Sequence, residues 1–276
     1  MISTGDELVE PGVEPGPGQI VDSNSYMLAA AVREAGADAV RIGPVPDDEA
    51  TLEGALRDEA QRSDLILTSG GVSMGAYDTV KAVLTRLGGV DFVKVSMQPG
   101  MPQGSGRVGS TPIVTLPGNP VSSYVSFEVF VRPLIRRLLG HRDLHRPHIH
   151  AICAREFTSP GAKTQFARVS LRAEDGLLMA EPEGGQGSHI IGGLSRADGL
   201  AVIPVGTDRV RVGDELVVWT CAEGHRERGL HSSRRARLGP NGRRQRQGHH
   251  RAHGHCIRAC LRIRRGHRPV ARRRHA

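Results

Sequence analysis

The stretch from Leu65 to Asp78 sets the tightest limit on how this chain folds. An aliphatic run of buried-strand type ends in two adjacent glycines, Gly70 and Gly71, and a helical apolar spacing resumes at Val80. Paired glycines take positive φ readily and let backbone N–H groups approach a ligand, and the helix that follows adds partial positive charge at its start. The stretch therefore predicts a strand, a tight loop suited to an oxyanion, and a helix.

Strand-type and helix-type runs alternate through the first 140 residues. One strand is expected to end near Thr4, another to begin at Leu65, and three more to cover 39–42, 90–97 and 113–116. The expected helices follow Asp22 or Ser23, Asp47-Asp48, Asp78 and Pro120. This order predicts an α/β fold with three layers, a mostly parallel sheet covered by helices on both faces. Loops at the carboxyl ends of its strands are then expected to form one site.

Several carboxylates follow these strands, and each has two readings. Asp6 and Glu7 come after the first strand, Asp47 and Asp48 precede the second helix, and Asp78 falls in or near the first turn of the third. They could be ligand-handling groups above the sheet edge. Alternatively, Asp6 and Glu7 form a solvated acidic turn, and the other three are helix caps or first-turn carboxylates that stabilise a helix start.

The pattern of expected elements changes near residue 141, from alternating strands and helices to short β-type runs. Residues 141–150 form a polar, proline-containing linker. Five short β-type runs follow, separated by glycine-rich turns; the runs cover 151–156, 165–171, 177–181, 199–205 and 215–220. Such spacing is typical of a small β-barrel or sandwich. We expect an α/β domain at 1–140 and a small β-barrel domain at 148–221.

The net charge of +8 is unevenly distributed. Residues 223–276 hold 17 arginines, no lysine and two acidic residues, a charge of +15, which leaves −7 for residues 1–222. An Arg/His-rich segment with no apolar period cannot offset its chain entropy by burial, so the tail is expected to be disordered. Its abrupt onset resembles out-of-frame translation, and any nucleic-acid binding by it would be non-specific and sensitive to salt.

Other features bound the cellular setting. No apolar run approaches the roughly 20 residues of a membrane span, and the N-terminus lacks the layout of a signal peptide. The four cysteines do not suggest a disulfide framework. We expect a soluble cytoplasmic protein. Because only two or three strand residues precede the first loop, we also expect that the first strand continues upstream of Met1.

Five motifs stand in a fixed order ahead of the β domain. They are Ser3-Thr4-Gly5-Asp6-Glu7-Leu8, Gly18-Gln19-Ile20-Val21-Asp22-Ser23-Asn24, Asp47-Asp48, Ser69-Gly70-Gly71-Val72-Ser73-Met74-Gly75-Ala76-Tyr77-Asp78 and Leu116-Pro117-Gly118-Asn119-Pro120. With these motifs, residues 1–221 resemble the molybdopterin molybdenumtransferases, the family of MoeA and the gephyrin E domain.

The resemblance implies an enzyme of molybdenum cofactor biosynthesis. Such an enzyme takes adenylyl-molybdopterin and molybdate, hydrolyses the adenylate, and inserts molybdenum with release of AMP, assisted by Mg²⁺. We expect Asp78, with Asp47 or Glu7, to be the catalytic carboxylates that hold this divalent ion, and oxygen ligands favour Mg²⁺ over zinc. Matches to binding positions are Thr4, Gly5, Asp6, Ser69, Gly70, Gly71, Val72, Ser73, Gly75, Pro117, Gly118, Asn119 and Pro120. A homodimer and a molybdopterin adenylyltransferase partner are also implied.

One loop departs from the family pattern. Many members read Lys-Pro-Gly-Lys-Pro where molybdate is thought to bind, whereas this chain reads Gln98-Pro99-Gly100-Met101-Pro102 and loses both charges. We expect Lys94 and Arg168 to supply the remaining cations for an oxyanion, and Ser188 matches a family position near the same cleft.

Two other functions remain open on the sequence alone. Family members carry a linker-like dimerising region and a small domain upstream, so this chain could instead be a catalytically silent scaffold that binds the pterin. It could also be a molybdopterin adenylyltransferase-like or CinA-like relative of the same fold. Those relatives usually read Gly-Gly-Thr-Gly with a following Arg-Asp, whereas this chain has Gly-Gly-Val-Ser and Gly-x-x-Asp, which favours the molybdenum-inserting branch.

Overall fold

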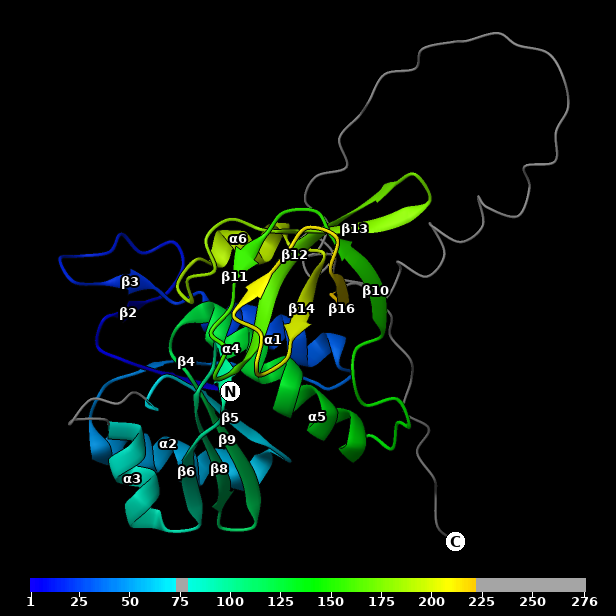
Figure 1. Ribbon diagram of the computed structural model, residues 1–276. Coiled ribbons are helices and arrows are strands. Elements are labelled where there is room, and N and C mark those ends of the chain that lie inside the picture. Colours follow the sequence, from blue (N-terminus) through cyan, green and yellow to red (C-terminus); the bar gives the residue numbers. More distant parts are fainter. Residues whose placement is uncertain (73–78, 222–276) are drawn as a thin grey trace, which may run out of the picture.

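The computed structural model describes residues 1–72 and 79–221 (Figure 1). A six-stranded sheet forms the first half, in the order β4-β1-β5-β9-β8-β6. Its strands are β1 (Ile2–Thr4), β4 (Ile42–Val45), β5 (Ile66–Ser69), β6 (Val90–Lys94), β8 (Pro102–Val108) and β9 (Thr111–Leu116). The first four in spatial order run parallel, β8 pairs antiparallel with β9, and β6 pairs antiparallel with β8. The carboxyl ends of β4, β1, β5 and β9 therefore lie at one edge.

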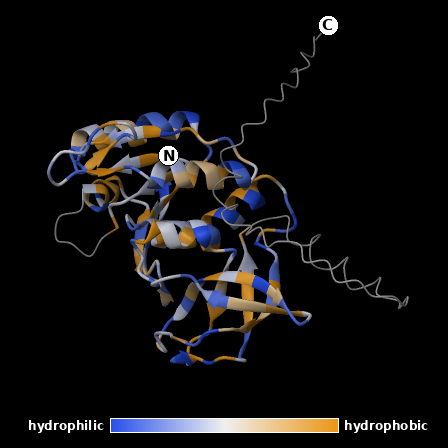
Figure 2. Cartoon of the chain, turned by 90° about the horizontal axis from the view of Figure 1, so that it is seen from above, coloured by the Kyte–Doolittle hydropathy of each residue, from blue (hydrophilic) through white to orange (hydrophobic). Residues whose placement is uncertain are grey.

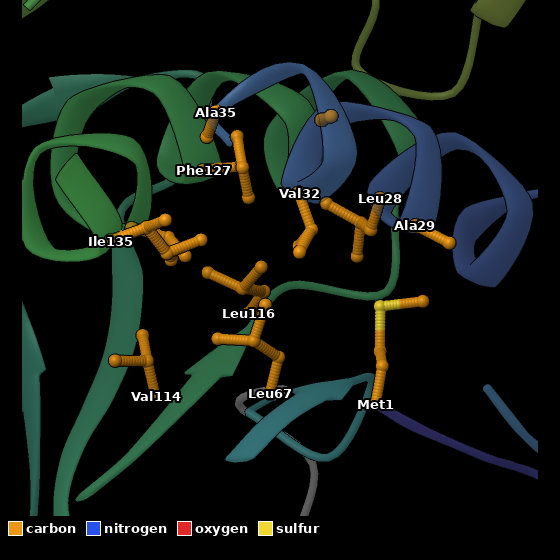
Figure 3. Packing of buried hydrophobic residues seen from close by; sticks show 12 residues of the cluster. Met1, Leu28, Ala29, Val32, Ala35, Leu67, Val114, Leu116, Phe127 and Ile135 are labelled. Carbon is orange, nitrogen blue, oxygen red and sulfur yellow. The ribbon is translucent and has the colours of Figure 1, made fainter. Parts of the chain in front are cut away.

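Helices cover both faces of this sheet, as predicted. One face carries α1 (Asn24–Glu34) and a continuous helical segment made of α4 (Pro120–Ser126), the π-helical η1 (Phe127–Val131) and α5 (Arg132–Leu138); the other carries α2 (Glu49–Arg62) and α3 (Thr79–Leu87). Successive side chains of β5 point to opposite faces of the sheet and so contribute to both hydrophobic cores. Leu67 packs against the first group of helices and Ile66 against the second. Figure 3 shows the first core, with Leu28 and Val32 of α1 facing Leu67 and Leu116 on the strands.

The C-terminal half is a closed barrel. Its strands are β10 (His148–Cys153), β12 (Thr164–Glu174), β13 (Leu177–Pro182), β14 (Gly199–Ile203) and β16 (Glu215–Thr220). They follow the order β13-β10-β16-β14-β12, and pairing of β12 with β13 closes the circle. In Figure 2, hydrophobic residues recur along these strands between hydrophilic loops. Smaller elements are α6 (Ile191–Arg196) and the pairs β2 (Leu8–Val9) with β3 (Ile20–Val21) and β11 (Phe157–Thr158) with β15 (Arg209–Val210).

The predicted strand over 90–97 is wrong in its second half. The strand β6 ends at Lys94, and Met97–Gln98 form a separate strand, β7, which pairs in parallel with β12 of the barrel. The chain turns between them, where Met97 N–H donates to Val95 O over 2.8 Å and Val95 N–H donates to Met101 O. One short strand of the first half thus belongs to the sheet of the second.

The strand β8 was not expected, because Pro102, Gly104 and Gly106 are poor strand formers. The close packing of the sheet explains two of them. A Cβ at Gly104 would lie 2.1 Å from Thr115 Oγ1, and one at Gly106 would lie 1.8 Å from Gly89 O. The expected strand at 39–42 is also displaced, since β4 begins at Ile42 and includes Pro44. Proline is tolerated there because β4 is an edge strand.

A buried arginine ties the two halves together. The guanidinium of Arg146 donates to both carboxylate oxygens of Glu128 over 2.9 Å, to Glu34, and to Cys221 O over 3.0 Å. These partners lie on η1, on α1 and just beyond β16. Burial alone would lower the pKa of Arg146, but its hydrogen bonds to Glu128 and Glu34 raise that pKa above the usual value. Arg146 therefore stays charged inside the protein.

Two further expectations from the sequence concern a membrane span and the C-terminal tail. The described residues contain no helix long and apolar enough to cross a membrane. The tail, expected to be disordered, lies outside the described residues.

Candidate functional site

A cavity of about 740 Å³ lies over the carboxyl ends of the parallel strands. Its walls include the loops after β1, β4, β5 and β9, the strand β3 and the starts of α1, α3 and α4. Of the residues expected at the site, those that line it are Thr4, Gly5, Glu7, Asp47, Ser69, Gly70, Gly71, Val72, Pro117, Gly118, Asn119 and Pro120. Segments more than 100 residues apart in sequence thus meet in one cavity.

The loop after β5 requires its glycines. Gly70 and Gly71 have φ values of +97° and +74°, and a Cβ at Gly71 would lie 2.2 Å from Val80 Cβ on α3. Only glycine allows this left-handed backbone to pack so closely on the next helix. The N–H of Gly70 donates to Leu116 O over 3.1 Å, which fixes the loop against β9. Gly71 and Val72 remain as the candidate donors of this loop to a ligand.

Asn24 joins three walls of the cavity. Its Nδ2 donates to Ser69 Oγ over 2.9 Å and to Gly118 O over 2.5 Å. Gly118 O can only accept a hydrogen bond, so the nitrogen end of the Asn24 side-chain amide, and not its oxygen, must face it. Asn24 was absent from the expected site residues, although it closes the Asp22-Ser23-Asn24 motif. The motif supported the family resemblance and a helix start, but no single residue of it indicated a role at the site.

The carboxylates of the cavity come from three loops, which carry Glu7, Asp22 and Asp47. Glu7 and Asp47 both line it, and the Asp6 carboxylate accepts from the backbone N–H of Asp47 over 3.0 Å. A Cβ at Gly5 would lie 2.3 Å from Glu7 Oε2, so the glycine leaves room for the Glu7 side chain. Asp6 thus holds the Asp47 loop while Glu7 and Asp47 face the cavity. Asp78, Ser73 and Gly75 lie outside the described residues.

Asp48 has a different role from its neighbour Asp47. It is the N-cap of α2, where its Oδ2 accepts from Thr51 N over 2.7 Å and from Thr51 Oγ1. The hydrogen bonds from Thr51 lower the pKa of Asp48. The alternative of a helix cap therefore describes Asp48, while Asp47 faces the cavity.

Replacing Asp48 with alanine is expected to lower the melting temperature modestly, because α2 loses its cap. Since the folded-state pKa of Asp48 is lowered, the contribution is present above the ordinary carboxyl pKa and is lost as the pH falls through the lowered value. Thermal melts of parent and variant should differ at pH 7 and converge well below the ordinary pKa of about 3.9. A difference that persists in acid would contradict the capping explanation.

A second cavity of about 430 Å³ lies between the two halves of the chain. The loop 97–102 forms one wall and Gln186, Gly187, Ser188 and His189 form another. Pro102, Ser122 and His189 line both cavities, so the two adjoin. The Ser188 loop is fixed there, because Ser188 O accepts from Val121 N–H over 3.0 Å and Ser188 Oγ accepts from Asn119 Nδ2 over 3.0 Å.

Neither cation expected from the sequence is among the described residues that line these two cavities. Lys94 is exposed at the end of β6, the edge strand of the first sheet. Arg168 is buried, and its guanidinium donates to Gly187 O over 3.2 Å and to Gly185 O. Burial, as the main cause, lowers the pKa of Arg168. Arg168 thus holds the loop that bears Ser188. The lysine that does line the second cavity is Lys163, which the sequence did not single out.

Comparison with known families matches both halves of the chain. Residues 1–137 match the family model described as a probable molybdopterin binding domain, and residues 150–221 match the C-terminal region of MoeA, its domain IV. These two matches follow one another in the same order as the sheet and the barrel.

Individual relatives agree with these models. Molybdopterin molybdenumtransferase 2 of Mycobacterium tuberculosis is 50% identical over 225 residues, which cover 79% of this chain and 55% of the relative. The molybdopterin molybdenumtransferase of Haemophilus influenzae is 34% identical over 220 residues, covering 79% and 54%. A solved MoeA structure from Pyrococcus horikoshii superposes with a TM-score of 0.68 at 31% identity, covering 79% and 53%.

The chain spans about half the length of these relatives. Within that span the α/β sheet and the closed barrel have the fold class that the sequence predicted. The chain belongs to the MoeA family of molybdopterin molybdenumtransferases.

Proposed function

We propose that this chain binds adenylyl-molybdopterin in the first cavity and inserts molybdenum from molybdate, releasing AMP. The observation that carries the proposal is the composition of that cavity. Carboxylates and glycine-rich backbone face the same space, as a phosphate-containing ligand with a bound divalent cation requires. The names of the similar proteins, molybdopterin molybdenumtransferases, support the same reaction.

Backbone N–H groups are the proposed donors to the ligand's phosphates. Gly71 and Val72 would contribute from the loop after β5, and Gly118 and Asn119 from the loop after β9. These loops approach each other closely, since a Cβ at Gly118 would lie 3.7 Å from Gly70 Cα. Fixed backbone dipoles stabilise charge that develops on an oxyanion without reorganising during the reaction.

Glu7 and Asp47 are the proposed ligands of Mg²⁺, together with Asp78 on the basis of the sequence. Among the described residues, no group of three His, Cys, Asp or Glu side chains forms a complete metal cage. A pair of carboxylates nevertheless suits Mg²⁺, which keeps several waters and takes its other ligands from substrate phosphates. When bound, Mg²⁺ would neutralise the charge on the phosphate oxygens.

Release of AMP tests the proposal. Purified protein with adenylyl-molybdopterin, molybdate and Mg²⁺ is expected to release AMP, and chelation of Mg²⁺ is expected to suppress the release. Chromatographic measurement of AMP over time, with and without molybdate, gives the rate. Binding of the pterin without AMP release would instead favour a scaffold that holds the pterin and does not insert molybdenum.

The proposal extends to assembly and setting. We propose a homodimer, supported by the family resemblance and by the exposed apolar side chains of Ile20 and Val21, which line the cavity. A molybdopterin adenylyltransferase is the proposed partner that supplies the adenylated substrate. A cytoplasmic location accords with Cys153, a buried thiol. Light scattering on the purified chain, alone and with the adenylyltransferase, measures both assemblies.

A further inference from the structure

Histidines are concentrated in one short segment outside both cavities. Residues 1–222 contain five histidines, and four of them fall within 141–150. Two of these, His148 and His150, lie on the barrel strand β10, and neither is among the described residues that line the two cavities. Imidazole is the commonest metal ligand of proteins and suits zinc, copper and nickel, so this segment is a candidate metal site.

The two histidines stand on the same, outer face of β10. Ala151 and Cys153 are buried in the core of the barrel, whereas His148 and His150 alternate with them and are exposed. Residues two apart in a strand have Cα atoms roughly 6.6 Å apart and side chains on one face. This spacing lets two imidazole rings converge on one ion.

A carboxylate on the neighbouring strand holds one ring nitrogen of His150. His150 Nδ1 lies 2.8 Å from Glu215 Oε1 on β16, which pairs antiparallel with β10 (Figure 1). An ionised carboxylate only accepts hydrogen bonds, so the neutral ring carries its proton on Nδ1 and its lone pair on Nε2. A carboxylate in this position also orients the ring and makes it a stronger metal ligand.

The other ring nitrogens of the pair are not used by the fold. Within residues 1–72 and 79–221, His150 Nε2 and both ring nitrogens of His148 have no hydrogen-bond partner. Both side chains are exposed, so the rings can rotate in solvent. Two imidazole nitrogens on one face of β10 can therefore share one ion.

We propose that His148 and His150 bind one divalent transition-metal ion of the nickel, copper and zinc class on the outer face of β10, with Glu215 orienting His150. Among the described residues no group of three or more His, Cys, Asp or Glu side chains is placed to hold a metal, so the ion keeps water at its other positions. Nitrogen ligands distinguish this site from the proposed Mg²⁺ site, whose ligands are oxygens. The inference does not depend on the proposed function.

Titration of the full chain with Cu²⁺ tests the site through Trp219. This is the single tryptophan of the sequence, and it lies opposite His148 in the register of β10 and β16, so bound Cu²⁺ is expected to quench its fluorescence. Two imidazoles on one strand bind as a linked pair, so His148→Gln or His150→Gln should raise the midpoint of quenching about a hundredfold. An unquenched parent, or equal midpoints in parent and both variants, would overturn the proposal.

His141→Gln is the matched control. It removes another exposed histidine of the same segment, outside β10, and should titrate as the parent does. The eight histidines of residues 223–276 are unchanged in every variant, so any Cu²⁺ that they bind is common to all the titrations. If His141→Gln shifts the midpoint as far as His150→Gln does, the quenching reports unspecific binding to the segment and the assignment fails.

Two further titrations test the orienting carboxylate and the class of ion. Glu215→Gln is expected to weaken Cu²⁺ binding about tenfold, the usual effect of losing a carboxylate that orients a ligating histidine. An unchanged midpoint would overturn the role of Glu215. Excess Mg²⁺ should neither quench Trp219 nor shift the Cu²⁺ midpoint, because Mg²⁺ takes oxygen ligands. Competition by Mg²⁺ would mean that carboxylates hold the ion, and the histidine site would be refuted.

Discussion

Replacing Arg146 with methionine is expected to lower the free energy of unfolding by about 3–5 kcal/mol, the usual cost of breaking a buried ion pair from one side. The side chains of Arg146 and Glu128 are each 2% exposed, so the variant leaves the Glu128 carboxylate buried without its main partner. The nearest other cation is Arg132, whose Nε lies 3.9 Å from Glu128 Oε2. Denaturant unfolding at neutral pH measures the loss.

Two comparisons isolate the buried charge as the cause. Arg172→Met removes an arginine whose side chain is 50% exposed and paired with Glu174 and Glu181, and it should cost less than about 1 kcal/mol. Adding Glu128→Gln to Arg146→Met should recover part of the loss, because the unpaired carboxylate is then gone. If the double variant is as unstable as the sum of the single variants, the network contributes through packing and not through charge.

Asp47→Asn is expected to reduce Mg²⁺-dependent AMP release at least about tenfold, since even residues that only orient a metal ligand cost this much when they are lost. The substitution keeps the shape of the side chain and removes one of the carboxylates proposed to hold Mg²⁺. The backbone donors of the glycine loops remain, so pterin affinity should change little. Raising the Mg²⁺ concentration should recover part of the rate.

The neighbouring Asp48 provides the control. Asp48→Ala should release AMP at the parent's rate while melting at a lower temperature, whereas Asp47→Asn should melt as the parent does. The two carboxylates are adjacent in sequence, yet one faces the cavity and the other accepts from Thr51. A large loss of activity in Asp48→Ala, with Asp47→Asn unaffected, would contradict the assignment of Asp47 to the Mg²⁺ site and of Asp48 to the helix cap.

Local sequence signals were sufficient for the elements around the cavity. The run from Leu65 to Gly71 predicted a strand and a glycine loop, and β5 ends at Ser69 with both glycines at positive φ. Apolar spacing at Val80, Val83 and Leu84 predicted a helix buried on one side, which is α3. Each of these features depends on residues close together in the chain, which explains why the sequence alone revealed them.

Features that depend on distant partners were missed. The strand β8 is stable despite its glycines because Phe92 and Thr115 of its neighbours fill the space over Gly104. Lys94 carries the right charge but ends an edge strand and lines neither cavity, whereas Lys163 reaches Met101, 62 residues away. Arg146 lies in a segment that is polar by composition. Pairing across such separations leaves no local periodicity to detect.

The pairing of β7 with β12 has a consequence for any attempt to divide the chain. Cutting within 141–147 looks harmless, because the two family matches end and begin on either side of it. A barrel fragment made this way would lack Met97 and Gln98 and leave the backbone of Thr164 and Gln165 exposed on an open strand edge. Open edges recruit other strands, so the isolated barrel is expected to self-associate. A usable barrel fragment would have to carry its own substitute for the two residues borrowed from the first half.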